Sequence, residues 1–119
     1  DQGKKMKKNL LITLCLLVTL FVPIANGECI YPKKNFDIPN GSKATEAAMV
    51  EAQTATKAHQ TNLGSYRDCL DEELARIPKE VENYDEISKV SLKKFNAAVD
   101  AETQLAEDWG TAVRAYKAQ

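Results

Sequence analysis

The feature that most constrains the fold of this chain is a seven-residue spacing in its middle third. The residues of this first row are Met49, Thr56, Leu63, Leu70 and Ile77. A second set falls between them at steps of three and four: Ala52, His59, Tyr66 and Leu74. These steps place all of the residues on one face of an α-helix. Thr45 is a favourable N-cap residue and Glu46 is an acid in the first turn, so we predict one long helix from Thr45 to about Ile77.

One residue within this segment could interrupt the helix. Gly64 is a poor helix former, and Ser65 could cap a second helix. The seven-residue spacing nevertheless continues through Gly64 without a slip. We therefore favour a single helix that ends near Pro78, because proline cannot continue a helix.

A second long helix is predicted between Pro78 and the C-terminus. Asn83 followed by Glu86 has the spacing of a variant capping box, although Pro78 at the first helical position would also serve. The predicted apolar face consists of Tyr84, Ile87, Ser91, Leu92, Phe95, Ala98, Val99, Leu105, Ala106, Trp109, Ala112, Val113 and Tyr116. Two long amphipathic helices joined by a short connection pack antiparallel. The predicted fold class is all-α, with residues 45–119 forming an antiparallel two-helix hairpin.

The first 27 residues have the pattern of a secretory signal peptide behind a short upstream extension. Met6 is followed by Lys7 and Lys8, then by the apolar run 10–22 and Pro23. Ala25 and Gly27 occupy the −3 and −1 positions of a cleavage site. We expect cleavage after Gly27, and the alternative is an uncleaved membrane anchor. An extended arm, residues 28–44, would then open the mature chain, since Pro32, Pro39 and Gly41 exclude a helix there.

The charge of the expected mature chain excludes several classes of partner. Residues 28–119 carry 12 Lys and Arg against 16 Asp and Glu, a net charge of −4. Charges of both signs are interspersed, so the sequence shows neither the basic footprint of a nucleic-acid-binding protein nor a polybasic membrane patch. We therefore expect no nucleic-acid partner, and contact with the membrane only through the leader if it is not cleaved.

The two cysteines of the expected mature chain, Cys29 and Cys69, predict a disulfide. A lipoprotein signal needs a small residue before the modified cysteine, and here that residue is Glu28. Neither cysteine belongs to a Cys-x-x-Cys motif, and the single histidine, His59, has no partner at the spacing of metal ligands. We predict no cofactor and no metal. Two cysteines in an exported chain most often pair with each other; a bridge between two chains is the alternative.

A Cys29–Cys69 bridge dictates the path of the arm. The 24 helical residues from Thr45 to Cys69 span about 36 Å, and the 16 residues from Cys29 to Thr45 reach about 53 Å when extended. The arm must therefore run back along the first helix almost to its far end. We expect Ile30, Tyr31, Phe36 and Ile38 to lie in the groove between the helices.

Several motifs together resemble small exported helical proteins of proteobacteria. They are the arm that opens with Cys29, the Pro-Asn-Gly entry to the first helix, the Tyr66-x-x-Cys69-Leu70 segment and the terminal AEDWGTAVRAYKA, residues 106–118. The resemblance covers most of the mature chain. It implies a location in the cell envelope and a helical fold, and it implies no activity.

No set of residues predicts catalysis. We expect His59 to be an exposed or half-buried surface residue, and the acids of residues 68–73 to be solvated on the helix. The first functional hypothesis is therefore a periplasmic or secreted protein with a structural or protein-interaction role. Its interaction face would be the polar side of the first helix, formed by Gln53, Thr56, His59 and Gln60, and would take a partner helix or a second copy. The alternative is a binding module that holds a small apolar or peptide ligand between the helices and the arm.

Overall fold

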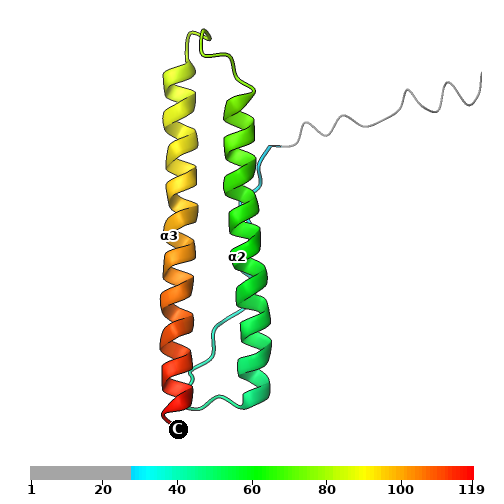
Figure 1. The fold of residues 1–119 in the computed structure, drawn as a ribbon, viewed down its shortest axis with the longest axis vertical. Helices are drawn as coiled ribbons and strands as arrows, with labels where there is room; N and C mark the ends of the chain where they lie inside the picture. The colour runs from blue at the N-terminus through cyan, green and yellow to red at the C-terminus, as the bar shows by residue number, and fades with distance from the viewer. Residues whose placement is uncertain (1–27) are drawn as a thin grey trace, which may run out of the picture.

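The computed structural model describes residues 28–119, which form a hairpin of two long antiparallel helices (Figure 1). Helix α2 spans Glu46–Ala75 and helix α3 spans Tyr84–Lys117, and within the described residues there is no strand. The predicted all-α hairpin with a disulfide-linked arm is confirmed. The predicted signal peptide and its cleavage after Gly27 lie outside the described residues and stay predictions.

Helix α2 is one continuous helix. The side-chain oxygen of Thr45 accepts a hydrogen bond from the backbone N–H of Ala48 at 3.1 Å, which caps the first turn as predicted. The helix passes through Gly64 without a break and ends at Ala75, two residues before the predicted end and three before Pro78. The burial pattern along the helix is therefore set by one uninterrupted seven-residue repeat.

The start of α3 differs from the capping box predicted for it. Asn83 is the N-cap residue, but its side chain makes no capping hydrogen bond. The backbone N–H of Tyr84 instead donates to the carbonyl of Val81 at 3.0 Å, because the connection between the helices turns tightly enough to bring that carbonyl into reach. Acids in the first turn and bases in the last turn complement the helix macrodipole; they are Asp85, Glu86, Arg114 and Lys117.

The core is narrow, as expected for two helices. Leu63 and Leu70 of α2 are fully buried against Ala98 of α3, and Phe95 and Ala101 of α3 pack beside them. A small residue at position 98 lets the helix axes approach closely, and Tyr66 closes one side of the cluster. Cys29 of the arm packs against this cluster, so the disulfide joins the arm to the best-packed part of the hairpin.

The arm covers one side of the hairpin. In Figure 1 it passes behind α2, from the end of the hairpin where the C-terminus lies toward the other end. At the C-terminal end, Gly41 is buried against α3: a Cβ built on it would lie 1.9 Å from the carbonyl oxygen of Ala112. The side chain of Asn40 accepts a hydrogen bond from the N–H of Ser42 at 3.1 Å and shapes the turn here. The arm therefore runs antiparallel to α2, as the length of the helix requires.

Two groups of apolar residues lie elsewhere than predicted. In the arm, Ile30 is 83% exposed and Tyr31 is 46% exposed, whereas Phe36 and Ile38 are half-buried. The prediction that Ile30 lies in the groove is wrong, since the neighbouring Cys29 takes the inward position. On α3, Leu92 and Val99 are 58% and 37% exposed, so the predicted apolar face is wider than the face that α2 and the arm cover.

Candidate functional site

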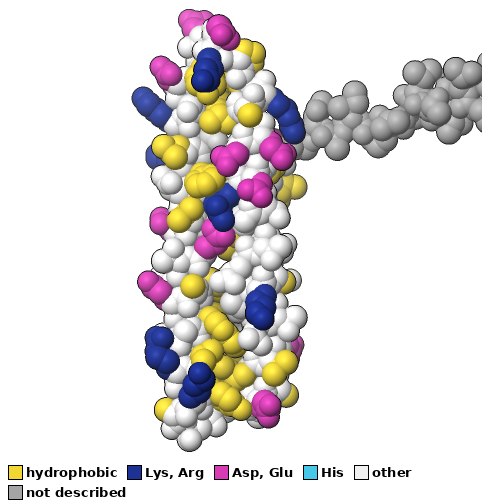
Figure 2. Space-filling view, in the orientation of Figure 1, with side chains coloured by type: hydrophobic (Ala, Val, Ile, Leu, Met, Phe, Trp, Pro, Cys, Tyr) yellow, Lys and Arg dark blue, Asp and Glu magenta, His cyan; other side chains and the backbone are white. Residues whose placement is uncertain are grey.

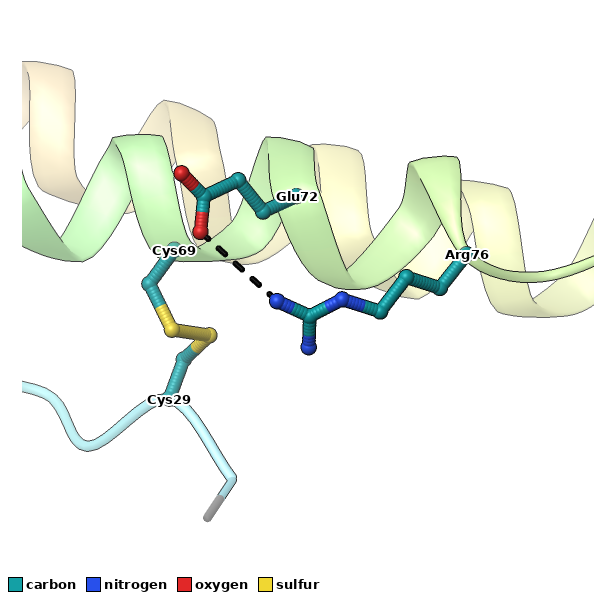
Figure 3. Close-up of a disulfide and its surroundings, with 4 residues drawn as sticks. All are labelled: Cys29, Cys69, Glu72 and Arg76. Atoms are coloured by element: carbon teal, nitrogen blue, oxygen red, sulfur yellow. Dashed lines mark ion pairs between the residues drawn. A yellow bond between two sulfur atoms is a disulfide. The ribbon is translucent and has the colours of Figure 1, made fainter. Parts of the chain in front are cut away.

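The disulfide between Cys29 and Cys69 anchors the arm to the last third of α2, toward the connection between the helices (Figure 3). The two Cα atoms lie 5.7 Å apart across a sequence separation of 40 residues. This distance falls in the ordinary range for disulfides. Disulfides persist in oxidising environments, so the bridge indicates a setting outside the cytoplasm. Glu72 and Arg76, one turn further along α2, form an exposed ion pair at 3.8 Å that is typical of a solvated helix face.

His59 lies under the arm. Its side chain is 7% exposed, and its ring meets Phe36 of the arm edge to face, with 5.8 Å between the ring centroids. Burial lowers the pKa of His59 below its usual value, and the nearby Lys34 ammonium lowers this pKa further. The prediction that His59 is an exposed or half-buried surface residue is wrong, because the arm that the disulfide holds in place covers it.

Thr56 is buried as well, at 2% exposure, and its hydroxyl has no hydrogen-bond partner. Two of the four residues of the predicted interaction face, Thr56 and His59, are therefore buried in the monomer. Gln53 is exposed and Gln60 is half-buried. These two glutamines belong to another side of the hairpin, described below, and a role for them in binding stays a prediction.

Two hollows lie between the arm and α3. One, of about 220 Å³, lies beside His59 and is lined by Tyr31, Pro32, Lys34, Ala101, Gln104, Leu105 and Asp108. The other, of about 500 Å³, lies at the far end of the arm and is lined by Lys34, Asp37, Ile38, Pro39, Asn40, Gly41, Asp108, Thr111, Ala112 and Ala115. Both are open at the surface and have charged side chains of both signs in their walls.

A third hollow lies at the tip of the hairpin and does not involve the arm. It has a volume of about 300 Å³ between the end of α2 and the start of α3. Its lining combines apolar side chains with charged and polar ones; the lining residues are Glu73, Leu74, Ile77, Asn83, Glu86, Ile87, Val90, Ser91 and Lys94.

The side of the hairpin that faces away from the arm is called the open face. Residues that contact the arm, such as Tyr66 on α2 and Ala101 on α3, occupy one flank of each helix. The next residue along each helix is turned by about 100°, so Arg67 and Glu102, which pair with each other, lie on the other flank. On α3 the rows of the open face are Leu92, Val99, Ala106, Val113 and Phe95, Glu102, Trp109, Tyr116. On α2 they are Val50, Lys57, Gly64, Asp71 and Gln53, Gln60, Arg67, Leu74.

Figure 2 shows this open face, since the arm lies behind the helices in that view. Hydrophobic side chains gather along the line between α2 and α3, most densely toward the end that holds the C-terminus. Charged side chains lie mainly along the outer edge of α3 and in a group near the middle of the face. The open face thus combines a long apolar strip with a central polar group.

That central group is built around an ion pair between the helices. Nε of Arg67 lies 2.7 Å from Oε2 of Glu102, and Nη2 of Arg67 donates a hydrogen bond to Oε1 of Glu102 at 3.1 Å. The guanidinium also lies over the ring of Phe95, with 5.5 Å to the ring centroid. The hydrogen bond to Glu102 raises the pKa of Arg67. The pair links α2 to α3 on the side that the arm leaves uncovered.

The sequence contained a signal for the open face that the predictions did not use. Leu92, Val99, Ala106 and Val113 recur every seven residues, and the adjacent row, Asn96, Thr103 and Gly110, is uncharged. We assigned Leu92 and Val99 to the buried face because a helix can bury a broad apolar stripe. Helix α2 and the extended arm together cover only part of the apolar stripe of α3, so Leu92 and Val99 stay exposed.

Two further features bear on chemistry. Among residues 28–119, no three His, Cys, Asp or Glu side chains converge on a position where a metal ion could be held. Neither α2 nor α3 combines the length and hydrophobicity needed to span a bilayer.

Comparisons with protein-family models, with curated proteins and with solved structures find no match to this chain. Function is therefore inferred from the geometry of the disulfide, the arm and the open face.

Proposed function

We propose that this chain is a small exported protein that acts by binding another protein surface through its open face, without a catalytic step. It works in the periplasm or another oxidising compartment outside the cytoplasm. The Cys29–Cys69 disulfide supports the oxidising setting, and the leader pattern of residues 6–27 supports export. The disulfide and the arm stiffen one side of the hairpin and leave the other side for contact.

The observation that carries this proposal is the exposed, uncharged strip on α3. Leu92 and Val99 are exposed, the neighbouring row is Asn96, Thr103 and Gly110, and yet 28% of the residues in the chain are charged. Contiguous exposed apolar surface marks interaction sites in soluble proteins. The centres of protein interfaces are also depleted of charge and enriched in aromatic residues, and the half-buried rings of Phe95, Trp109 and Tyr116 border this strip.

The ligand-binding alternative has less support. A pocket for a small apolar ligand is mostly apolar and encloses its ligand. The hollows beside the arm are open, and Lys34, Asp37 and Asp108 lie in their walls. The arm therefore serves the fold as a brace, and we infer no ligand under it.

Site-specific photo-crosslinking tests the proposed function. The full chain would carry a photo-reactive amino acid at Val99, which is 37% exposed on the open face, or at the matched control Val81, which is 39% exposed in the connection between the helices. We expect discrete protein adducts from position 99 alone, formed on a chain that has lost residues 1–27 and contains the disulfide. Equal adducts from both positions, or none from position 99, would contradict binding through the open face.

A further inference from the structure

We propose that the partner bound by the open face is a second copy of this chain, packed antiparallel about a two-fold axis that crosses α2 at Gly64 and α3 between Glu102 and Thr103. This inference rests on the proposed function, because it assumes that the open face is the interaction surface. It adds the identity of the partner and the register of the contact.

The exposed row on α3 is self-complementary about this axis. Leu92 and Val113 lie at equal distances from the midpoint between residues 102 and 103, and so do Val99 and Ala106. An antiparallel second α3 therefore places Leu92 opposite Val113 of the second copy and Val99 opposite Ala106 of the second copy. Each exposed apolar side chain of the row meets another apolar side chain, which removes both from water.

The α2 row of Val50, Lys57, Gly64 and Asp71 also matches itself about this axis, through residues of opposite charge. Lys57 and Asp71 lie seven residues on either side of Gly64. An antiparallel second α2 therefore sets Lys57 opposite Asp71 of the second copy, and the reverse pair forms on the other side of the axis. Gly64, which has no side chain, lies at the point where the two α2 helices come closest, and small residues at such positions let helices approach.

Both midpoints lie at the same level of the hairpin, so one axis serves both rows. A Cβ built on Gly64 would lie 4.0 Å from Oε1 of Glu102 and 3.8 Å from Nη2 of Arg67. Gly64 thus lies beside the midpoint of the α3 row. The charges nearest the axis, Arg67 and Glu102, already neutralise each other within one chain, so the contact buries no unpaired charge at its centre.

The other two-fold arrangement fits less well. It would lay α2 across α3 of the second copy, and Lys57 and Asp71 would then face the apolar row instead of each other, which leaves both charges without a partner. In the favoured arrangement, the row from Leu92 to Val113 extends over about 31 Å. Two adjacent helices, each about 10 Å in diameter, make the face about 20 Å wide and about 600 Å² in area, which is of the order needed for a standard interface, roughly 800 Å² from each partner.

Analytical ultracentrifugation tests the contact on the full chain, expressed with its own leader and purified with the disulfide intact. We expect a reversible dimer. Val99→Glu should raise the dimer Kd at least 100-fold, because it buries carboxylates on both sides of the axis, whereas the matched control Val81→Glu should leave the Kd unchanged. Circular dichroism would verify that both variants remain helical.

Charge reversal tests the register. Lys57→Asp alone, or Asp71→Lys alone, sets like charges opposite each other and should raise the Kd by about tenfold. Within one chain these positions are about 21 Å apart, so they cannot compensate each other inside the monomer. Mixing the two single variants should restore association, because the carboxylate introduced at position 57 of one copy then faces the ammonium introduced at position 71 of the other, and the unchanged Asp71 and Lys57 face each other on the opposite side of the axis.

The outcomes separate this inference from the proposed function. A chain that stays monomeric at about millimolar concentration but forms adducts with another protein at position 99 would overturn the proposal that the partner is a second copy. It would still support the proposed function, binding through the open face. A dimer that tolerates Val99→Glu, or mixed single variants that associate no better than each alone, would overturn the face or the register. A monomer without adducts would overturn both proposals.

Discussion

Removing the disulfide is the sharpest test of how this fold is held together. The perturbation is the double substitution Cys29→Ser and Cys69→Ser, which leaves no free thiol among residues 28–119. The bridge closes a loop with a sequence separation of 40 residues. On the chain-entropy treatment, a loop of this length stabilises the folded state by about 4 kcal/mol relative to the uncrosslinked unfolded chain. That is a large share of the stability of a domain of about 90 residues.

The contacts of the arm decide whether this loss stays local. Cys29 packs against the cluster of Leu63, Tyr66 and Leu70, and without the bridge the arm is held to α2 mainly by ring contacts such as that of Phe36 with His59. We therefore expect the arm to detach and the hairpin core to become exposed on that side. For a domain of this size, a loss of about 4 kcal/mol lowers Tm by about 16–32 °C.

Thermal and urea unfolding followed by circular dichroism would measure this effect. The control is Glu72→Ala, which removes an exposed ion pair one turn from Cys69 and should leave the midpoint unchanged. The urea slope separates two causes, because it rises if the uncrosslinked unfolded chain exposes more surface. A double-serine variant whose unfolding free energy lies within about 1 kcal/mol of the oxidised parent would refute the view that the bridge and the arm carry the stability of the hairpin.

Two further predictions concern the arm. Burial and Lys34 lower the pKa of His59 in the folded chain, so the unfolded chain takes up the proton first as the pH falls. The free energy of unfolding should therefore decrease as the pH drops from about 6.5 toward the folded pKa. Urea titrations at several pH values should show a smaller decrease for His59→Phe, and an equal decrease in both chains would contradict this prediction. Gly41→Ala should destabilise the chain by about 1–3 kcal/mol, because its Cβ would lie 1.9 Å from the carbonyl oxygen of Ala112 and 2.8 Å from the N–H nitrogen of Tyr116, and backbone atoms cannot swing away. In the control Gly110→Ala, the atom nearest to the added Cβ belongs to the mobile guanidinium of Arg114, at 3.2 Å. The folded state of this variant should therefore be stabilised by up to about 1 kcal/mol through helix propensity. Denaturation midpoints that rank the two variants in the opposite order would count against the close contact at Gly41.

The burial of His59 shows why part of the site could not be predicted. Its place in the seven-residue pattern was visible, but a polar residue among threonines and glutamines is typical of a solvated surface. What buries His59 is the arm, which comes from residues about 23 positions earlier in the chain and is tied to α2 by the disulfide. The prediction placed the arm along α2 correctly, but it did not consider that the arm would cover the α2 side chains beneath it, such as His59.

Local patterns in the sequence determined the two helices, the cap at Thr45, the pairing of Cys29 with Cys69 and the direction of the arm. These features depend on helical periodicity, on backbone propensities and on the distance that a known number of residues can span, all of which can be read from neighbouring positions. The tertiary structure alone decided which flank of the hairpin the arm covers. That choice buries His59 and leaves Leu92 and Val99 exposed. A helix stripe of one sequence can face water or protein, and only the packing of distant segments determines which.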